Sequence, residues 1–184
     1  MEKSNCESKR QQLIKRISIT GPESTGKSKL AVDLAKHYQT VYVPEYSREY
    51  LKNIGINYSL DDVLNIAKGQ LFAEAQFMQL ANQVLFCDTD PLVSKIWCNE
   101  VYSQCPEWIE SKVTEHQYDL YLLCYPDIEW EPDVLRENPD NRKYLFDLYI
   151  KELEYLKFNY RVVNGKGSER LKNAIKFVNE LLAE

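Results

Sequence analysis

The chain has few glycines, few histidines and no long apolar run. Only six of its 184 residues are glycine and two are histidine. No stretch approaches the roughly 20 apolar residues that cross a bilayer, and the polar start lacks the apolar core of a signal peptide. We therefore expect a cytoplasmic protein with no membrane partner, in which residues 1–12 form a flexible tail.

An excess of basic residues is also lacking. The formal net charge is -5, with 28 acidic against 23 basic side chains. Binding to a nucleic-acid backbone requires a basic surface, so a nucleic-acid partner is not expected. With 44% hydrophobic and 28% charged residues, the chain has the composition of a globular protein, and its length suits one domain over residues 1–184. Nothing in the sequence indicates an oligomeric state.

No CxxC pair occurs among the five cysteines. Their odd number indicates free thiols in a reducing compartment, where they fill the core. Because His37 and His116 are the only histidines, a structural zinc site would need an unusual ligand set. The sequence therefore argues against both a disulfide framework and structural zinc.

Short apolar segments alternate with segments of helical periodicity along the chain. The predicted strands are 16–20, 40–44, 84–87, 118–124 and 160–163. The predicted helices are 29–38, one from about 47, 59–78, 91–104, 106–117, 144–158 and 171–181. This alternation predicts an α/β fold with a five-stranded parallel sheet, helices on both faces and ligands at the carboxyl ends of the strands.

The residues GPESTGKS (21–28) match the P-loop pattern G-x-x-x-x-G-K-[ST] between a strand and a helix. The glycines let the backbone wrap an anion at the positive end of the helix dipole. Lys27 is expected to meet the β- and γ-phosphates and Ser28 to ligate Mg²⁺. The alternative is a plain glycine turn. The predicted ATP-binding residues in this segment are Gly21, Glu23, Ser24, Thr25, Gly26, Lys27, Ser28 and Lys29.

Carboxylates follow the second and third strands. Asp88 is placed to hold Mg²⁺ through water, and the alternative is a strand-end cap. Asp90 binds substrate hydroxyls or caps the helix at Pro91. Glu45 is the preferred general base of the reaction, with a solvated or Arg48-paired carboxylate as the alternative. Arg48 either orients the substrate or pairs on the surface.

Residues 126–143 contain three prolines and mixed charges without periodicity. We expect a lid in which Arg136, Arg142 and Lys143 approach the phosphates on closure, and the planar guanidinium of arginine is suited to grip phosphate oxygens. The alternative is a surface loop whose acidic residues pair with these cations.

Two further features are weaker. Gly165 and Gly167 follow the fifth strand, where they either allow the backbone to approach adenine or form an ordinary turn capped by Ser168. Tyr46, Trp97 and Trp130 are candidates for stacking on a ring of the substrate or nucleotide, with ordinary packing as the alternative.

The chain resembles the ribosylnicotinamide kinase domain of the bacterial NadR family. The resemblance lies in GPESTGKS, VPEYSREYL, FCDTDPLVSKIW, YDLYLLCYPDIEWEPDVLRENP and NGKGSERL. Together these segments extend over nearly the whole chain from about Ile14 onward.

This resemblance implies a nucleoside- or nucleotide-kinase-like P-loop fold and phosphorylation of the ribose 5′-hydroxyl of nicotinamide riboside, with ATP and Mg²⁺. It assigns Lys27 and Ser28 to ATP and metal, and Arg136 to the lid. It also implies that Glu45, Asp88 and Asp90 line the acceptor site. The adenylyltransferase signature of larger NadR proteins is absent from this sequence, so we expect kinase activity alone.

Two alternatives remain open from the sequence. One is a P-loop kinase for another nucleoside or small alcohol, since an acceptor pocket can change while the P-loop stays. The other is an ATPase or nucleotide-dependent switch. A GTPase is disfavoured because none of the six glycines has an aspartate three residues before it.

Overall fold

The computed structural model describes residues 14–55, 57–133, 136 and 139–183. The predicted tail, residues 1–12, lies outside the described residues. None of the described helices is both long and apolar enough to span a bilayer.

The described strands form one parallel sheet in the order β2-β3-β1-β4-β5. The strands are β1 (Lys15–Thr20), β2 (Tyr42–Val43), β3 (Val84–Asp88), β4 (Leu120–Cys124) and β5 (Tyr160–Val163). The predicted parallel α/β fold is thereby confirmed. Because β1 lies in the centre, the loop that follows it lies at the middle of the sheet's carboxyl edge.

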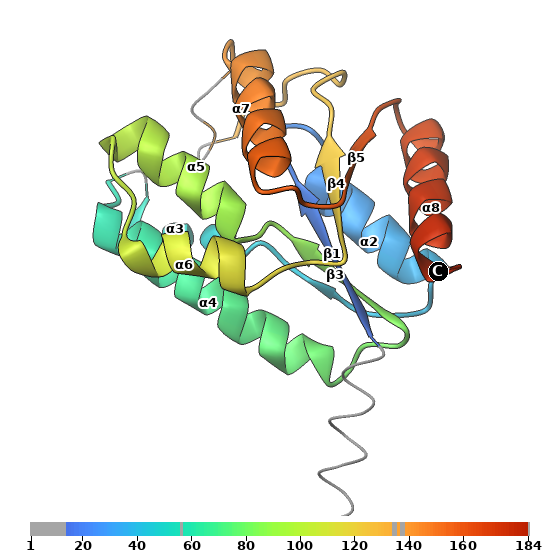
Figure 1. The fold of residues 1–184 in the computed structure, drawn as a ribbon. Coiled ribbons are helices and arrows are strands. Elements are labelled where there is room, and N and C mark those ends of the chain that lie inside the picture. Colours follow the sequence, from blue (N-terminus) through green and yellow to red (C-terminus); the bar gives the residue numbers. More distant parts are fainter. Residues whose placement is uncertain (1–13, 56, 134–135, 137–138, 184) are drawn as a thin grey trace, which may run out of the picture.

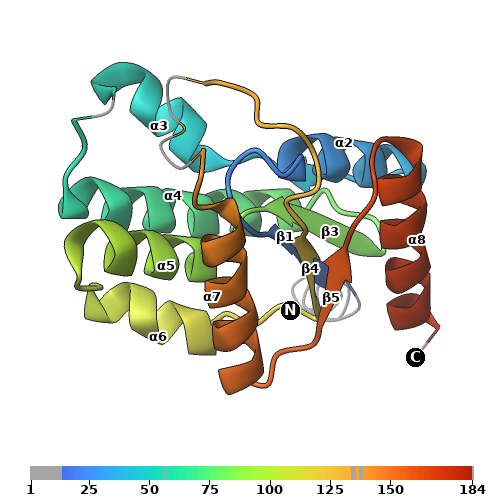
Figure 2. The same cartoon turned by 90° about the horizontal axis from the view of Figure 1, so that it is seen from above.

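Seven described helices cover the two faces of the sheet (Figure 1). They are α2 (Lys27–His37), α3 (Tyr46–Ile54), α4 (Leu60–Met78), α5 (Pro91–Tyr102), α6 (Glu107–Glu115), α7 (Arg142–Tyr155) and α8 (Ser168–Leu182). Seen from above, α2 and α8 lie on one side of the strands, and α4, α5, α6 and α7 on the other (Figure 2).

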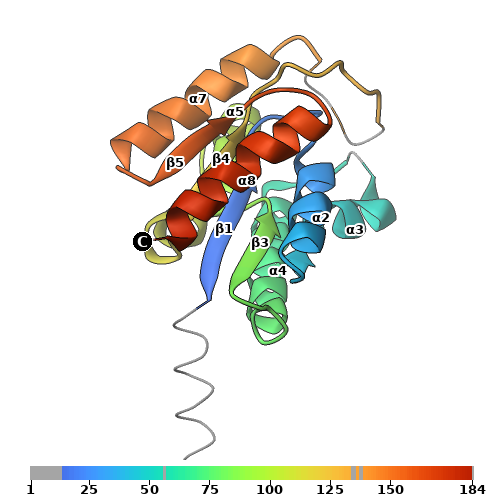
Figure 3. The same cartoon turned by 90° about the vertical axis from the view of Figure 1, so that its right-hand side faces the viewer.

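Each face of the sheet has its own apolar core. Ile17 and Ile19 of β1 pack with residues of α2 and α8, the pair of helices seen in front of the sheet in Figure 3. Leu85 and Cys87 of β3 point the other way and pack with residues of α5 and α7. This alternation buries both faces of the central strands, as is typical of a parallel sheet.

Several boundaries differ from the prediction: β4 starts two residues later, α8 starts three residues earlier, and α7 covers Arg142–Tyr155 instead of 144–158. The helix α2 starts at Lys27, two residues earlier than predicted, because its N-cap is the P-loop residue Gly26. The strand β2 is restricted to Tyr42–Val43, and ahead of it the Thr40 hydroxyl donates to the carbonyl of Val84 at 2.7 Å.

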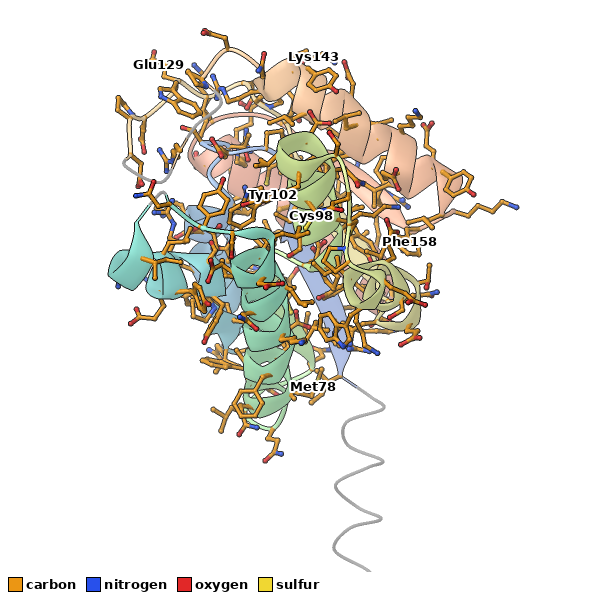
Figure 4. The ribbon with its side chains drawn as sticks, turned by 90° about the vertical axis from the view of Figure 1, so that its left-hand side faces the viewer. Met78, Cys98, Tyr102, Glu129, Lys143 and Phe158 are labelled. Atoms are coloured by element: carbon orange, nitrogen blue, oxygen red, sulfur yellow. The ribbon has the colours of Figure 1, made fainter. Side chains whose placement is uncertain are left out.

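The capping box predicted at Ser59 is confirmed. The Ser59 hydroxyl accepts a hydrogen bond from the Asp62 N–H, and the Asp62 carboxylate accepts one from the Ser59 N–H. These contacts start α4, whose last residue, Met78, lies at the end of the molecule opposite Glu129 and Lys143 of the expected lid (Figure 4).

Candidate active site

The loop between β1 and α2 has the backbone of an anion cradle. Gly21, Ser24 and Gly26 all have positive φ angles, of 124°, 52° and 76°. Gly26 is the N-cap of α2 and has no side chain to cap the helix. A Cβ on Gly21 would lie 3.0 Å from the carbonyl oxygen of Cys124, so this turn needs glycine for space as well as for φ. These features fit phosphate binding by backbone N–H groups.

Lys27 lies over this loop. Its ammonium donates to the carbonyl oxygens of Gly21 and Pro22 at 2.9 and 2.8 Å, and the Thr25 hydroxyl donates to the same Pro22 carbonyl at 2.8 Å. The Lys27 side chain is therefore held at the loop, where a phosphate chain would lie.

A pocket of about 1170 Å³ opens at this edge of the sheet. Its wall combines the P-loop and α2 with parts of α3, α5, α7, α8 and the expected lid. A volume above the roughly 300–1,000 Å³ of a typical ligand site allows two small molecules to bind together. The predicted residues on the wall are Gly21, Glu23, Ser24, Thr25, Gly26, Lys27, Ser28, Lys29, Glu45, Arg48, Trp97, Arg136 and Gly167.

Asp88 lies at the end of β3 and is 1% exposed. Its Oδ1 atom is buried and has no hydrogen-bond partner among the described residues. Burial, followed by repulsion from Glu45, raises the Asp88 pKa to about 6, against the opposing effects of the Ser28 hydroxyl and of Lys27 and Arg48. A cation would stabilise this buried carboxylate, whose Oδ1 is unpaired beside a P-loop serine among the described residues.

This donor set fits Mg²⁺ with a nucleotide. No group of three or more His, Cys, Asp and Glu side chains that could hold a metal occurs in the described part of the chain. Magnesium does not need such a cage, because it binds through one or two carboxylates with substrate phosphates and water. Ser28 and Asp88 would hold it, as the sequence predicts.

Glu45 and Arg48 lie together at the start of α3. The Glu45 carboxylate accepts from the Ser47 hydroxyl at 2.9 Å and from Arg48 Nε at 3.1 Å. Arg48 Nη1 also donates to Asp133 of the expected lid at 3.0 Å. The pairing weighed as an alternative is therefore present, although both side chains also line the pocket.

Asp90 caps a helix. Its Oδ1 accepts from the N–H groups of Leu92 and Val93, at 2.7 and 3.2 Å, and its Oδ2 accepts from the Ser18 hydroxyl. The residue is 2% exposed. With both oxygens engaged and the side chain buried, the geometry favours the capping interpretation over the substrate-binding one.

The three candidate aromatic residues lie in different surroundings. Trp97 lines the pocket and donates its indole N–H to the Tyr58 hydroxyl at 3.0 Å. Tyr46 packs against α4, where a Cβ on Gly69 would come within 2.1 Å of its ring. Trp130 has the Arg142 guanidinium 5.8 Å from its ring centroid. Among these three, the geometry favours a stacking role for Trp97 alone.

The expected lid touches the P-loop at Ser24. The Ser24 hydroxyl accepts from the Glu131 N–H at 2.9 Å and from Arg136 at 3.4 Å. Arg142 donates to the Ser24 carbonyl at 3.1 Å and to the Ile128 carbonyl at 2.9 Å. Both predicted lid arginines thus contact the loop that would hold the phosphates.

Residues 164–167, here called the glycine loop, connect β5 with α8. Gly165 has a φ of 92° and donates its N–H to Asp127 at 2.6 Å. The predicted cap at Ser168 is wrong: Gly167 is the N-cap of α8, with no side-chain hydrogen bond, because Ser168 already belongs to the helix.

Sequence reasoning missed Arg170. This side chain lines the pocket yet is 5% exposed, and it contacts the P-loop, the start of the lid and the glycine loop. A signal was present, since Arg170 falls on the buried stripe of α8 with Ala174, Val178 and Leu181. A charge on the inward stripe of an amphipathic helix indicates a buried polar contact.

Comparison with known proteins places the chain among P-loop proteins. A family model described as an AAA domain matches residues 16–170. The NadR protein of Escherichia coli, named a trifunctional NAD biosynthesis and regulator protein, is 27% identical over 180 residues. That match covers 93% of this chain and 43% of NadR, so the chain spans less than half the length of this curated relative.

Solved structures agree with this placement. A crystal structure of NadR in complex with NR superposes with a TM-score of 0.83 at 25% identity, over 97% of this chain and 54% of that one. A NadR complex with NAD and AMP-PNP superposes with a TM-score of 0.79 at 22% identity, over 97% of this chain and 52% of that one. A deoxyadenosine kinase from M. mycoides superposes with a TM-score of 0.62 at 11% identity, over 90% of this chain and 99% of that one. This likeness shows the fold alone. The chain therefore belongs to the AAA domain family, as a homologue of NadR with the fold of P-loop nucleoside and nucleotide kinases.

Proposed function

We propose that the protein is an ATP-dependent kinase that phosphorylates the ribose 5′-hydroxyl of nicotinamide riboside and yields nicotinamide mononucleotide. The observation that carries this proposal is that Lys27 of the P-loop and Glu45 of the predicted acceptor side line one pocket. Homology to NadR, and the similarity to a NadR structure that contains NR, support the choice of acceptor.

The nucleotide half of the site consists of the P-loop and the residues that contact it. Its N–H groups and Lys27 bind the phosphates, and Arg136 and Arg142 approach them from the lid, residues 126–143. The NadR complex with AMP-PNP supports ATP as the donor. Bound Mg²⁺ would neutralise charge on the transferring phosphoryl group, and Ser28 and Asp88 hold it in this proposal.

The acceptor half lies across the pocket, where Glu45, Arg48 and Trp97 line the wall. Glu45 accepts the proton of the acceptor hydroxyl, and Arg48 orients that carboxylate through their 3.1 Å contact. Phosphoryl transfer depends mainly on positioning and charge neutralisation, so the base adds a smaller share of the rate. Trp97 supplies a flat surface for the ring of the nucleoside.

The experiment is a coupled assay of ADP release with Mg·ATP and a panel of nucleosides that includes nicotinamide riboside. We expect nicotinamide riboside to stimulate ADP release well above the rate with ATP alone. Stimulation by another nucleoside and not by nicotinamide riboside would contradict the acceptor assignment and leave a P-loop kinase. Equal ADP release with and without every acceptor would indicate an ATPase.

A further inference from the structure

Arg170 connects three loops that are distant in sequence. Its Nε donates to the Gly165 carbonyl at 2.8 Å, Nη1 to the Thr25 carbonyl at 2.8 Å, and Nη2 to the Tyr125 carbonyl at 2.9 Å. Nη2 also pairs with the carboxylate of Asp127. One guanidinium thus joins the glycine loop, the P-loop and the start of the lid.

The contact to Thr25 bears on phosphate binding. In a trans peptide the carbonyl and the following N–H point in opposite directions, and the described chain contains no cis peptide. The Gly26 N–H therefore points away from the Arg170 guanidinium that binds the Thr25 carbonyl. In a P-loop this N–H belongs to the cradle that faces the phosphates.

Asp127 completes the connection from the lid side. Its Oδ1 pairs with Arg170, and its Oδ2 accepts the Gly165 N–H at 2.6 Å. The Gly165 residue is therefore held through both backbone groups, its carbonyl by Arg170 and its N–H by Asp127. The side chains of Arg170 and Asp127 together hold the glycine loop next to the P-loop.

The chemistry requires arginine. A planar guanidinium offers five N–H donors in a fixed fork, whereas a lysine ammonium is a point charge with three. The three carbonyl oxygens and the Asp127 carboxylate approach Arg170 from different directions, and the forked donors of a guanidinium can bind all four at once. At 5% exposure, water is a poor substitute for these contacts.

We propose that Arg170 is a positioning residue for the nucleotide: it holds the P-loop, the glycine loop and the start of the lid in one arrangement, and so sets the affinity for ATP. This inference rests on the proposed function, because it assumes that ATP binds in the P-loop half of the pocket. Arg170 acts through the backbone of the three loops and has no part in the acceptor half.

The test compares Arg170→Lys and Arg170→Gln with the wild type, by calorimetric binding of Mg·AMP-PNP and by steady-state kinetics. We expect the Kd for Mg·AMP-PNP and the KM for ATP to rise about tenfold in Arg170→Lys and more in Arg170→Gln. The KM of the acceptor should stay within about twofold. If Arg170 only stabilised the fold, its variants would not raise the KM for ATP while leaving the KM of the acceptor unchanged. This holds provided that each variant is measured well below its melting temperature.

Arg161→Lys and Arg161→Gln are the matched controls. Arg161 is an exposed arginine on β5, and among the described residues its hydrogen bonds go to Asn159 and Tyr160, outside the three loops. If Arg170→Gln does not fold, Arg170→Lys and Asp127→Asn provide the test, with an expected rise in Kd of roughly threefold to tenfold for Asp127→Asn.

Two results would overturn the inference in distinguishable ways. If the wild type binds Mg·AMP-PNP and the folded Arg170 variants bind it equally well, the positioning role is wrong and the proposed function stands. If the wild type itself does not bind Mg·AMP-PNP, the proposed function and this inference both fail.

Discussion

Asp88 is held where its charge is unfavourable. Burial and the nearby Glu45 raise its pKa to about 6, and its Oδ1 has no partner among the described residues. A buried carboxylate with a raised pKa and an unpaired oxygen is typical of functional groups. The proposed role in holding Mg²⁺ accounts for this arrangement.

The substitution Asp88→Asn should lower kcat by at least about two orders of magnitude, since the neutral amide holds Mg²⁺ poorly. The measurement is steady-state kinetics at saturating ATP and acceptor over a range of Mg²⁺ concentrations. Asp147→Asn is the control, because Asp147 is exposed on α7 and pairs with Lys143. Near-normal turnover of Asp88→Asn would remove Asp88 from the site.

The same substitution should stabilise the protein at neutral pH. Because the folded pKa of Asp88 is raised from 3.8 to about 6, the folded state binds the proton more tightly than the unfolded state. Ionisation of Asp88 therefore destabilises the folded state as the pH rises from the unfolded pKa of 3.8 to the folded pKa of about 6.

Asp88→Asn removes this penalty, so its free energy of unfolding at pH 7.5 should exceed that of the wild type by roughly 1–3 kcal/mol. The gain should vanish near pH 4. Denaturant unfolding at both pH values, without Mg²⁺ or nucleotide, checks this. An equal difference at the two pH values would show that the charge of Asp88 is not the cause.

The role of Arg170 could not be derived from sequence, although its place on the buried stripe of α8 signalled a polar contact. Its partners lie 145, 45 and 5 residues away in the chain. Only the folded sheet brings the ends of β1, β4 and β5 together. The P-loop itself was predictable because its glycines, lysine and serine are contiguous.

At the scale of elements, α5 depends on its first turn. Asp90 accepts the N–H groups of Leu92 and Val93, and Pro91 occupies the first helical position. The sequence left the choice between cap and substrate contact open, since an aspartate before a proline suits both. The contact from Ser18 of β1, 72 residues earlier, decides in favour of a structural role.

We predict that Asp90→Asn keeps the KM of the acceptor within about threefold, because asparagine caps helices as well as aspartate does. Asp90→Ala should lower the free energy of unfolding by roughly 1–3 kcal/mol, since the cap is lost and buried donors are left unpaired. Acceptor kinetics and denaturant unfolding of both variants test this. A large rise in acceptor KM in Asp90→Asn, without loss of stability, would restore the substrate-binding interpretation.

The proposed lid, residues 126–143, meets the P-loop through Ser24, whose φ of 52° is unusual for a residue other than glycine. We predict that Arg136→Gln lowers kcat roughly tenfold to a hundredfold and raises the fraction of ATP hydrolysed without transfer. Loss of the arginine weakens closure and admits water.

Lys143→Gln is the matched control for the lid, since Lys143 is a lid cation that pairs with Asp147 on the surface. The measurement is ADP formed per phosphorylated acceptor for each variant. The lid proposal fails if Arg136→Gln and Lys143→Gln behave alike.

At the scale of the whole molecule, the alternation of strands and helices was predictable because burial on both faces leaves continuous apolar strands in the sequence. The residues of the proposed acceptor half were harder to predict from the sequence. Glu45, Arg48 and Trp97 lie at the start of α3 and in α5, and the order of the sheet brings them to the pocket that Lys27 also lines. Periodicity within each helix carries no information on that order.

The central claim is that the two halves of one pocket bring ATP and a nucleoside hydroxyl together for transfer. The direct measurement is quantitative mass spectrometry of the products formed from ATP and nicotinamide riboside with Mg²⁺. The account predicts one nicotinamide mononucleotide for each ADP, with the phosphate on the ribose 5′-oxygen. ADP accompanied by inorganic phosphate and no phosphorylated nucleoside would contradict it.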